Sequence, residues 1–306
     1  MSNIAPSLSP LDISRAPEGG EIGPVQSGWR LALREFSRNK LAVIGLGILV
    51  FFVVFCFVGP LFYHGNTINT NLTASDVPPS AGYPLGTTSE GFDELGLLMR
   101  GGQVSLEVGF LAAAVGIVIG MIWGAISGLA GGIVDSAMMR VVDVFLSVPF
   151  LFVILIVAVR YGASVLSLSL IIGAYTWLVP ARLVRGEVLT LKTRDFVAAA
   201  RSAGSGRWRL IRRHLIPNAL GVIIVNVTFN IADAILAVAF LGFLGFGLQY
   251  PTQDWGDMLS TGVAQMQNGY WWLVFPVGAC LVIVIMACNM VGDALRDSLD
   301  VRLRRR

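Results

Sequence analysis

The chain has 306 residues, of which 55% are hydrophobic and 13% are charged, and its mean hydropathy is +0.73. A soluble domain carries about 25% charged residues, so this composition excludes an ordinary soluble enzyme and indicates a membrane protein. The net charge of +3 does not indicate nucleic-acid binding, because the basic residues lie beside apolar segments. Three cysteines inside apolar runs and two histidines in different loops predict neither a disulfide framework nor a metal or cofactor site in this chain.

The first 40 residues are interpreted as cytoplasmic. Residues 1–27 are rich in Pro, Gly and Ser and lack an apolar core, so we expect a disordered cytoplasmic tail and no cleavable signal peptide. Residues 28–40 predict a basic amphipathic lead-in helix on the cytoplasmic membrane surface, with Trp29, Leu33 and Phe36 on one side. A plain lead-in to the first membrane span is the alternative.

Six apolar runs predict six transmembrane helices. The first covers residues 41–62, and about 20 residues are enough to cross the apolar core of a bilayer. A polar extracytoplasmic segment is expected at residues 63–103 and a cytoplasmic tail at 293–306. Between them we expect a core domain, residues 104–292, whose five transmembrane helices lie near 104–129, 141–159, 163–179, 220–243 and 271–291.

Two of these predicted helices carry local signals. The second has a glycine at every fourth position from Gly116 to Gly128, a spacing that lets helices approach closely in lipid. The run GGIVDSAMMR, Gly131–Arg140, predicts a short inner loop, and Pro149 is expected to kink the third helix. Pro180 is expected to lie where the fourth helix ends.

A basic segment at residues 182–218 separates the fourth predicted helix from the fifth. If this segment is cytoplasmic, six spans place both termini inside the cell. All but two of the 22 Lys and Arg residues, Arg100 and Arg160, then lie on the cytoplasmic side, as the positive-inside rule requires. The sequence therefore predicts an all-α integral membrane protein with six transmembrane helices and both termini cytoplasmic.

The basic segment contains its own helical signals. The run DFVAAARSAG forms a short helix from Asp195 that Gly204 stops, and the basic run RWRLIRRHLI then leads to Pro217. Alanine favours helix, glycine ends it, and proline is tolerated in the first turn of the next helix. We therefore expect a helix, a sharp bend and a second helix that together form a docking element. A solvated basic loop that holds the membrane orientation is the alternative.

This segment resembles the EAA loop of ABC importer permeases, in which the motif EAA is followed by a glycine and later by a proline. Ala198 stands in place of the glutamate and His214 in place of an isoleucine, whereas Gly204 and Pro217 keep the spacing. The resemblance implies a coupling helix that fits a groove on an ATPase subunit. Its coupling residues are Asp195, Ala198, Ala199, Ala200, Arg201, Gly204 and Pro217. Whether Asp195 supplies the missing acid stays open.

Other motifs resemble those of dipeptide and oligopeptide permeases. They are FLGFGLQYPTQDWGDML, WWLVFPVG, MVGDALRDSLDVRLR and GGIVDSAMMRVVDVFLSVPF. The run PLGTTSEGFDELG is similar to a segment that precedes the second span in these permeases, but Phe92 replaces its arginine and one residue is inserted. The short outer segment and the basic lead-in resemble the C-type subunit.

The resemblance implies a type I ABC importer permease fold in a bacterial or archaeal cytoplasmic (inner) membrane. It implies four kinds of partner: a homologous second permease, two ATP-binding subunits or a fused ATPase, an extracytoplasmic peptide-binding protein, and the lipid bilayer. ATP and Mg would be bound by the ATPase subunits, since this chain has no P-loop and is not itself expected to be an enzyme. The implied cargo is a di- or oligopeptide, with nickel or another solute as the alternative.

The fifth predicted helix carries Asn226, Asn230 and Asp233 at positions i, i+4 and i+7, which lie on one helix face. Polar side chains inside a membrane normally face protein or a water-filled path. We therefore expect these residues to line a translocation path or gate, with simple interhelical hydrogen bonding as an equal alternative. Asp233 also raises a proton-coupled secondary transporter as a less favoured hypothesis, and a membrane scaffold without transport is a third.

Overall fold

The computed structural model describes residues 36–248 and 251–304. In these two ranges the chain is helical, and its sole extended pairing is an isolated bridge between Thr87 and Asp93. The expected tail at 1–27 and most of the lead-in at 28–40 lie outside the described residues. The long helices are α2 (Lys40–Phe57), α4 (Glu94–Ala130), α5 (Gly132–Leu146), α6 (Phe150–Tyr161), α7 (Val165–Thr176), α8 (Leu178–Leu191), α11 (Ile216–Phe243), α12 (Trp255–Gln265) and α13 (Phe275–Arg304).

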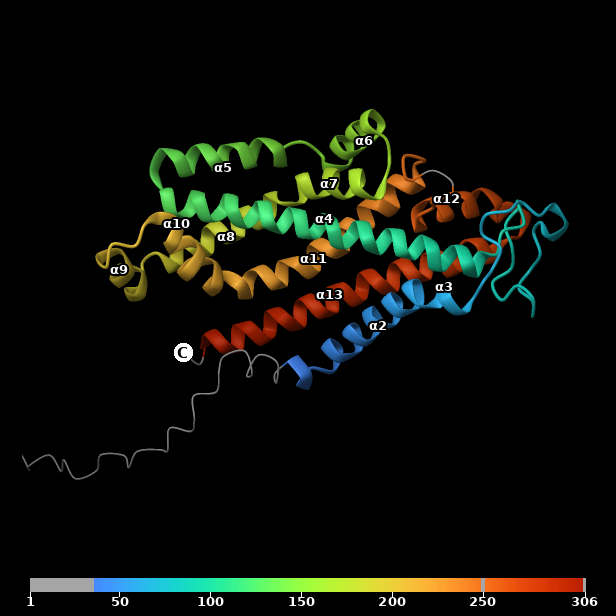
Figure 1. The fold of residues 1–306 in the computed structure, drawn as a ribbon, viewed down its shortest axis with the longest axis horizontal. Helices are drawn as coiled ribbons and strands as arrows, with labels where there is room; N and C mark the ends of the chain where they lie inside the picture. Colours follow the sequence, from blue (N-terminus) through green and yellow to red (C-terminus); the bar gives the residue numbers. More distant parts are fainter. Residues whose placement is uncertain (1–35, 249–250, 305–306) are drawn as a thin grey trace, which may run out of the picture.

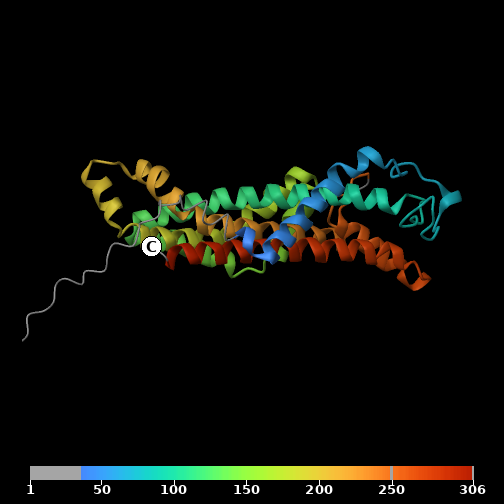
Figure 2. The same ribbon diagram turned by 90° about the horizontal axis from the view of Figure 1, so that it is seen from below.

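Shorter helical segments connect these long helices. They are α3 (Gly59–Phe62), η1 (Leu72–Ala74), α9 (Asp195–Ser202), α10 (Arg207–Leu210), the π-helix η2 (Ile211–Leu215), η3 (Met266–Asn268) and η4 (Trp271–Leu273). The long helices α2, α4, α11 and α13 run along the length of an elongated bundle (Figure 1). The helices α9 and α10 lie at one end of this bundle, and the polar segment after α3 lies at the other end with α12 (Figures 1 and 2).

Side-chain caps set the starts of the first two long helices. The Asn39 side chain accepts hydrogen bonds from the backbone N–H groups of Leu41 at 3.0 Å and Ala42 at 3.4 Å, so α2 begins at Lys40. The Asp93 carboxylate caps α4 by accepting from the N–H of Gly96 at 2.9 Å. The α4 helix therefore begins at Glu94, earlier than the predicted start of the second span at residue 104.

The glycines of α4 form the packing face that their spacing predicts. A Cβ added to Gly120 would lie 2.7 Å from the Pro180 side chain, and a Cβ added to Gly128 would lie 2.9 Å from the Val188 side chain. At Gly124 it would collide with the backbone oxygen of Ala181. Close backbone approach thus joins α4 to α7 and α8 over much of their length.

The third and fourth predicted helices differ from expectation. The expected inner loop at 131–140 is helical and belongs to α5, and α5 and α6 meet at an angle of 81° across residues 147–149. Pro149 is therefore a helix break and not a kink, because proline lacks an N–H donor and disfavours helical geometry in the residue before it. The fourth helix bends by 43° between α7 and α8 and then continues past Pro180, which lies in the first turn of α8. The basic segment predicted at 182–218 consequently begins inside a helix.

Four helical segments are long and apolar enough to cross a membrane: Lys40–Phe62, Glu94–Ala130, Gly221–Phe243 and Trp271–Ser298. The bent pairs α5–α6 and α7–α8 also meet this criterion when each pair is taken together. The described residues thus provide between four and six spans, and the protein is an integral membrane protein with several apolar helices.

Candidate functional site

The basic segment folds as a protruding helical element at one end of the bundle. The α9 helix is separated from α8 by Lys192–Arg194, and it ends before a turn at Gly204. The φ angle of Gly204 is +78°, and no atom lies within 4 Å of the position that its Cβ would occupy. The left-handed backbone conformation at this position favours glycine, whereas a side chain would meet no steric obstacle. The predicted helix, bend and second helix are present, although the second helix is split into α10 and a π-helical turn.

The α9 helix is held to the membrane helices by one face and presents the other face outward. The Val197 side chain is fully buried in an apolar cluster with residues of α4, α8 and α11, and Ala200 packs against this cluster. Asp195, Ala198 and Ala199 are exposed. Three of the residues expected to contact an ATPase are therefore exposed on a helix that Val197 and Ala200 attach to the bundle.

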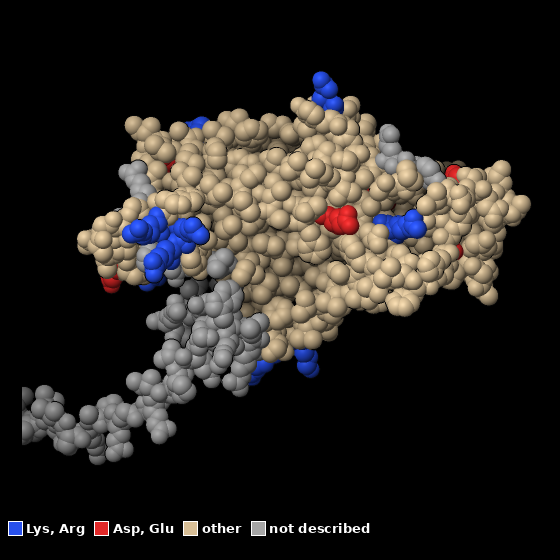
Figure 3. All heavy atoms as spheres, viewed as in Figure 1, with Lys and Arg blue, Asp and Glu red and all other residues tan. Residues whose placement is uncertain are grey.

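The remaining coupling residues are placed as follows. Pro217 is exposed in the first turn of α11, directly after the π-helical turn η2. Arg201 belongs to α9, but its side chain lies outside the described part of the structure. Lys and Arg side chains gather at this end of the molecule (Figure 3). Exposed basic residues of the segment are Arg182, Arg194, Arg209, Arg212 and Arg213.

An ion pair that the sequence analysis did not predict joins α8 to α5 near the end of the bundle where α9 lies (Figure 1). The guanidinium of Arg185 on α8 donates to the Asp135 carboxylate on α5 through Nε at 2.5 Å and Nη2 at 2.6 Å. The Ser127 hydroxyl of α4 also donates to this carboxylate. Asp135 was missed because its surroundings were interpreted as a loop. Nearby, the Lys192 ammonium donates to the Gly128 carbonyl at 3.1 Å, so three helices meet at the base of α9.

The polar residues Asn226, Asn230 and Asp233 line the wall of one cavity of about 460 Å³. The opposite wall comes from the α5–α6 break and from α7 and α8, and it includes Tyr175 and Thr176. The Asn226 amide donates to the Val222 carbonyl at 2.7 Å, whereas the Asn230 amide nitrogen is buried without a hydrogen-bond partner among the described residues. The three side chains share one face as the spacing predicts, and their role in translocation stays a prediction.

Two family models match the chain. The model described as binding-protein-dependent transport system inner membrane component matches residues 116–305, and the N-terminal TM domain of oligopeptide transport permease C matches residues 27–79. Taken together, these matches include the coupling segment, the polar face of α11 and the whole first span.

Curated relatives resemble the chain over nearly its whole length. The oligopeptide transport system permease protein OppC of Bacillus subtilis is 37% identical over 306 residues, which cover 100% of both chains. OppC of Haemophilus influenzae is 40% identical over 91% of this chain and 90% of that protein. The dipeptide transport system permease protein DppC of Bacillus subtilis is 37% identical over 90% of this chain and 86% of that protein.

A solved structure shares the fold. It is the methionine ABC transporter MetNI in inward-facing conformations, of which one chain matches with a TM-score of 0.51 and 23% identity, covering 66% of this chain and 96% of that chain. The likeness shows the fold of an ABC importer permease. The chain therefore belongs to the binding-protein-dependent transport system inner membrane components, and within them to the C-type permeases of the dipeptide and oligopeptide transporter family.

Proposed function

We propose that this chain carries di- or oligopeptides across a bacterial or archaeal cytoplasmic membrane as one permease subunit of an ATP-driven importer. The observation that carries the proposal is the 37% identity to an oligopeptide permease over the full length of both chains. The two other relatives are likewise named for dipeptide or oligopeptide transport.

We propose six spans, with the bent pairs α5–α6 and α7–α8 each crossing the membrane once. Both termini and the coupling segment then lie in the cytoplasm. The distribution of Lys and Arg residues in the sequence supports this orientation. So does the end of α13, which lies toward the same end of the bundle as α9 (Figure 1).

In the proposed complex, α9 docks in a groove of an ATPase subunit that binds ATP and Mg. A homologous second permease completes the membrane path, and an extracytoplasmic binding protein delivers the peptide. Closure of the ATPases on ATP moves α9, and its anchoring through Val197 transfers the movement to α4, α8 and α11. The Asn226, Asn230 and Asp233 face lines the path that opens. ATP drives this change because it binds one state of the complex more tightly than the other.

The assembly is tested by affinity purification of the tagged chain from its native membrane in mild detergent, followed by mass spectrometry. We expect a second multi-span permease and P-loop ATPase subunits, and ATP hydrolysis that peptide and binding protein stimulate. Recovery of the chain alone, with uptake that a protonophore abolishes and ATP depletion does not, would instead support the proton-coupled hypothesis centred on Asp233.

The coupling role is tested by Gly204→Pro, because proline cannot adopt the φ of +78° found at Gly204. We expect an assembled complex whose peptide-stimulated ATP hydrolysis is lost. Gly206→Ala is the matched control, since an added Cβ there meets no atom within 4 Å and its φ lies outside the left-handed region. Normal transport by the Gly204→Pro complex would refute the coupling role of this bend.

A further inference from the structure

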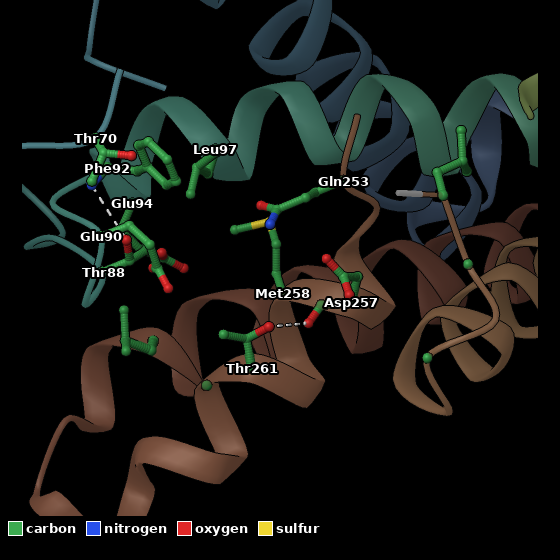
Figure 4. A pocket seen from close by; sticks show the side chains of 15 residues that line it. Thr70, Thr88, Glu90, Phe92, Glu94, Leu97, Gln253, Asp257, Met258 and Thr261 are labelled. Carbon is green, nitrogen blue, oxygen red and sulfur yellow. Dashed lines mark hydrogen bonds between the residues drawn. The ribbon is translucent and has the colours of Figure 1, made fainter. Parts of the chain in front are cut away.

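A second cavity, of about 550 Å³, lies at the end of the bundle opposite α9. It opens between the start of α4, the chain that follows α11, and α12 (Figure 4). Three carboxylates line it, from Glu90, Glu94 and Asp257. None of the described residues on its wall is Lys, Arg or His. A volume between about 300 and 1,000 Å³ is typical of cavities that hold small molecules.

Hydrogen bonds and close backbone packing hold the walls of this cavity. The Trp272 indole donates to the Thr87 carbonyl at 3.2 Å and fastens the polar segment before α4 to η4, which precedes α13. Gly91 has a φ of +75°, and an added Cβ there would collide with the Asn71 carbonyl. On the other side, the buried Trp255 indole donates to the Leu98 carbonyl at 2.9 Å and fixes α12 against α4. The two acidic sides of the cavity are therefore held in place independently of a ligand.

Glu94 is the residue that points to a ligand. Its side chain is 2% exposed, and among the described residues its carboxyl has no hydrogen-bond or ion-pair partner. In the adjacent Asp93 carboxyl each oxygen already has a partner, because it accepts from the Tyr63 hydroxyl at 2.6 Å and from the Gly96 N–H at 2.9 Å. Figure 4 shows Glu90 and Glu94 on one side of the cavity and Asp257 with Met258 on the other. A buried carboxylate without a partner is unfavourable, and a cation entering the cavity would offset that cost.

The wall chemistry indicates an organic cation and not a metal ion. Among the described residues, no three His, Cys, Asp or Glu side chains converge as metal ligands. Apolar side chains stand beside the carboxylates, including Phe92, Leu97 and Met258. A ligand with an ammonium group attached to an apolar body would match both features, since its charge would bind the carboxylates while its body contacts the apolar wall.

We propose that this cavity binds the α-ammonium end of a short peptide, with Glu94 as the main acceptor and Asp257 as a second acidic contact across the cavity. The inference rests on the proposed peptide transport and assigns to this chain a peptide site on the extracytoplasmic side of the membrane. The peptide occupies it after release from the binding protein and before it enters the path beside Asp233.

The test uses the full-length chain purified in detergent and measures the affinity of L-alanyl-L-alanine by saturation-transfer NMR. We expect N-acetyl-L-alanyl-L-alanine to bind at least about tenfold more weakly, because acetylation removes the charge that the carboxylates bind. Glu94→Gln should weaken L-alanyl-L-alanine binding by a similar factor while keeping the side-chain shape. Glu107→Gln is the matched control, since Glu107 is an exposed acid on the same helix outside the cavity.

Circular dichroism shows whether Glu94→Gln folds. If it does not, Asp257→Asn serves as the second variant, with a smaller expected loss of affinity for L-alanyl-L-alanine. Equal binding of free and acetylated dipeptide, or unchanged affinity in both variants, would overturn the site. Peptide uptake by cells that carry the wild-type chain is measured separately. Uptake together with unchanged affinity in both variants refutes the site and leaves the proposed function standing. Charge-dependent binding without any peptide uptake refutes the proposed function and leaves the site standing.

Discussion

Removing the Arg185 guanidinium should destabilise the fold more than removing one partner of an exposed ion pair. The Asp135 side chain is 11% exposed and the Arg185 side chain 33% exposed, with two N–O distances of 2.5 and 2.6 Å between them. Removing one partner of a buried pair costs about 3–5 kcal/mol because the other charge is left uncompensated. Since Arg185 is partly exposed, we expect Arg185→Ala to lower the free energy of unfolding by about 3 kcal/mol.

The same two helices provide a matched control. Arg182 on α8 pairs with Asp143 on α5 at the same distance of 2.5 Å, but the two side chains are 49% and 46% exposed. Exposed pairs contribute about 0–1 kcal/mol, so Arg182→Ala should change the free energy of unfolding by less than about 1 kcal/mol. The difference between the two variants therefore isolates the effect of burial.

The assay is reversible unfolding of the purified chain in mixed detergent micelles, followed by circular dichroism. A double-mutant cycle with Asp135→Asn should give a coupling free energy of about 2 kcal/mol, because removing both charges leaves neither one uncompensated. The reasoning is refuted if Arg185→Ala and Arg182→Ala destabilise the chain equally, or if the effects of the two changes at Arg185 and Asp135 simply add.

Three further predictions concern other parts of the chain. Asp195→Ala should keep the fold, because Asp195 is exposed, yet weaken retention of ATPase subunits during co-purification; full retention would show a surface residue without a coupling role. Trp255→Phe leaves the Leu98 carbonyl without its indole donor, and it should lower the free energy of unfolding by about 1–3 kcal/mol in the same detergent assay. Burial raises the pKa of Asp254 from its usual 3.8 to about 6, so the folded state binds the proton more tightly. The free energy of unfolding should consequently fall as the pH rises from about 4 to about 6, and Asp254→Asn should remove this dependence; identical pH profiles would contradict it.

Features with a strong local signal were predicted from the sequence. The glycine spacing of α4, the bend at Gly204 and the shared face of Asn226, Asn230 and Asp233 each depend on a few neighbouring residues. Local chemistry decides such features, because glycine alone fits a left-handed turn easily and a helix repeats every 3.6 residues.

The missed features depend on partners far away in the sequence. The expected loop at 131–140 is helical, and its Asp135 pairs with an arginine fifty positions later along the chain. The helix α12 was missed because the outer stretch after α11 was taken as a connection, whereas Asp254 caps it and Trp255 binds it to α4. Glu94 was passed over for the same reason, since neither its burial nor the cavity beside it follows from the residues around it in the sequence. The early start of α4 did have a local signal, the Asp93 cap.

The glycine stripe on α4 also determines where the molecule is stiff. Because α4 approaches the backbones of α7 and α8 at successive turns, these helices cannot slide past one another without collision. We therefore expect α4, α7 and α8 to shift together when α9 is displaced. We expect bending instead at residues 147–149, where α5 and α6 meet at an angle of 81°. An added methyl group at Gly120 would lie 2.7 Å from the Pro180 Cβ and 2.9 Å from the Trp177 carbonyl oxygen, so we expect Gly120→Ala to push α4 away from α8 at the centre of this packing face.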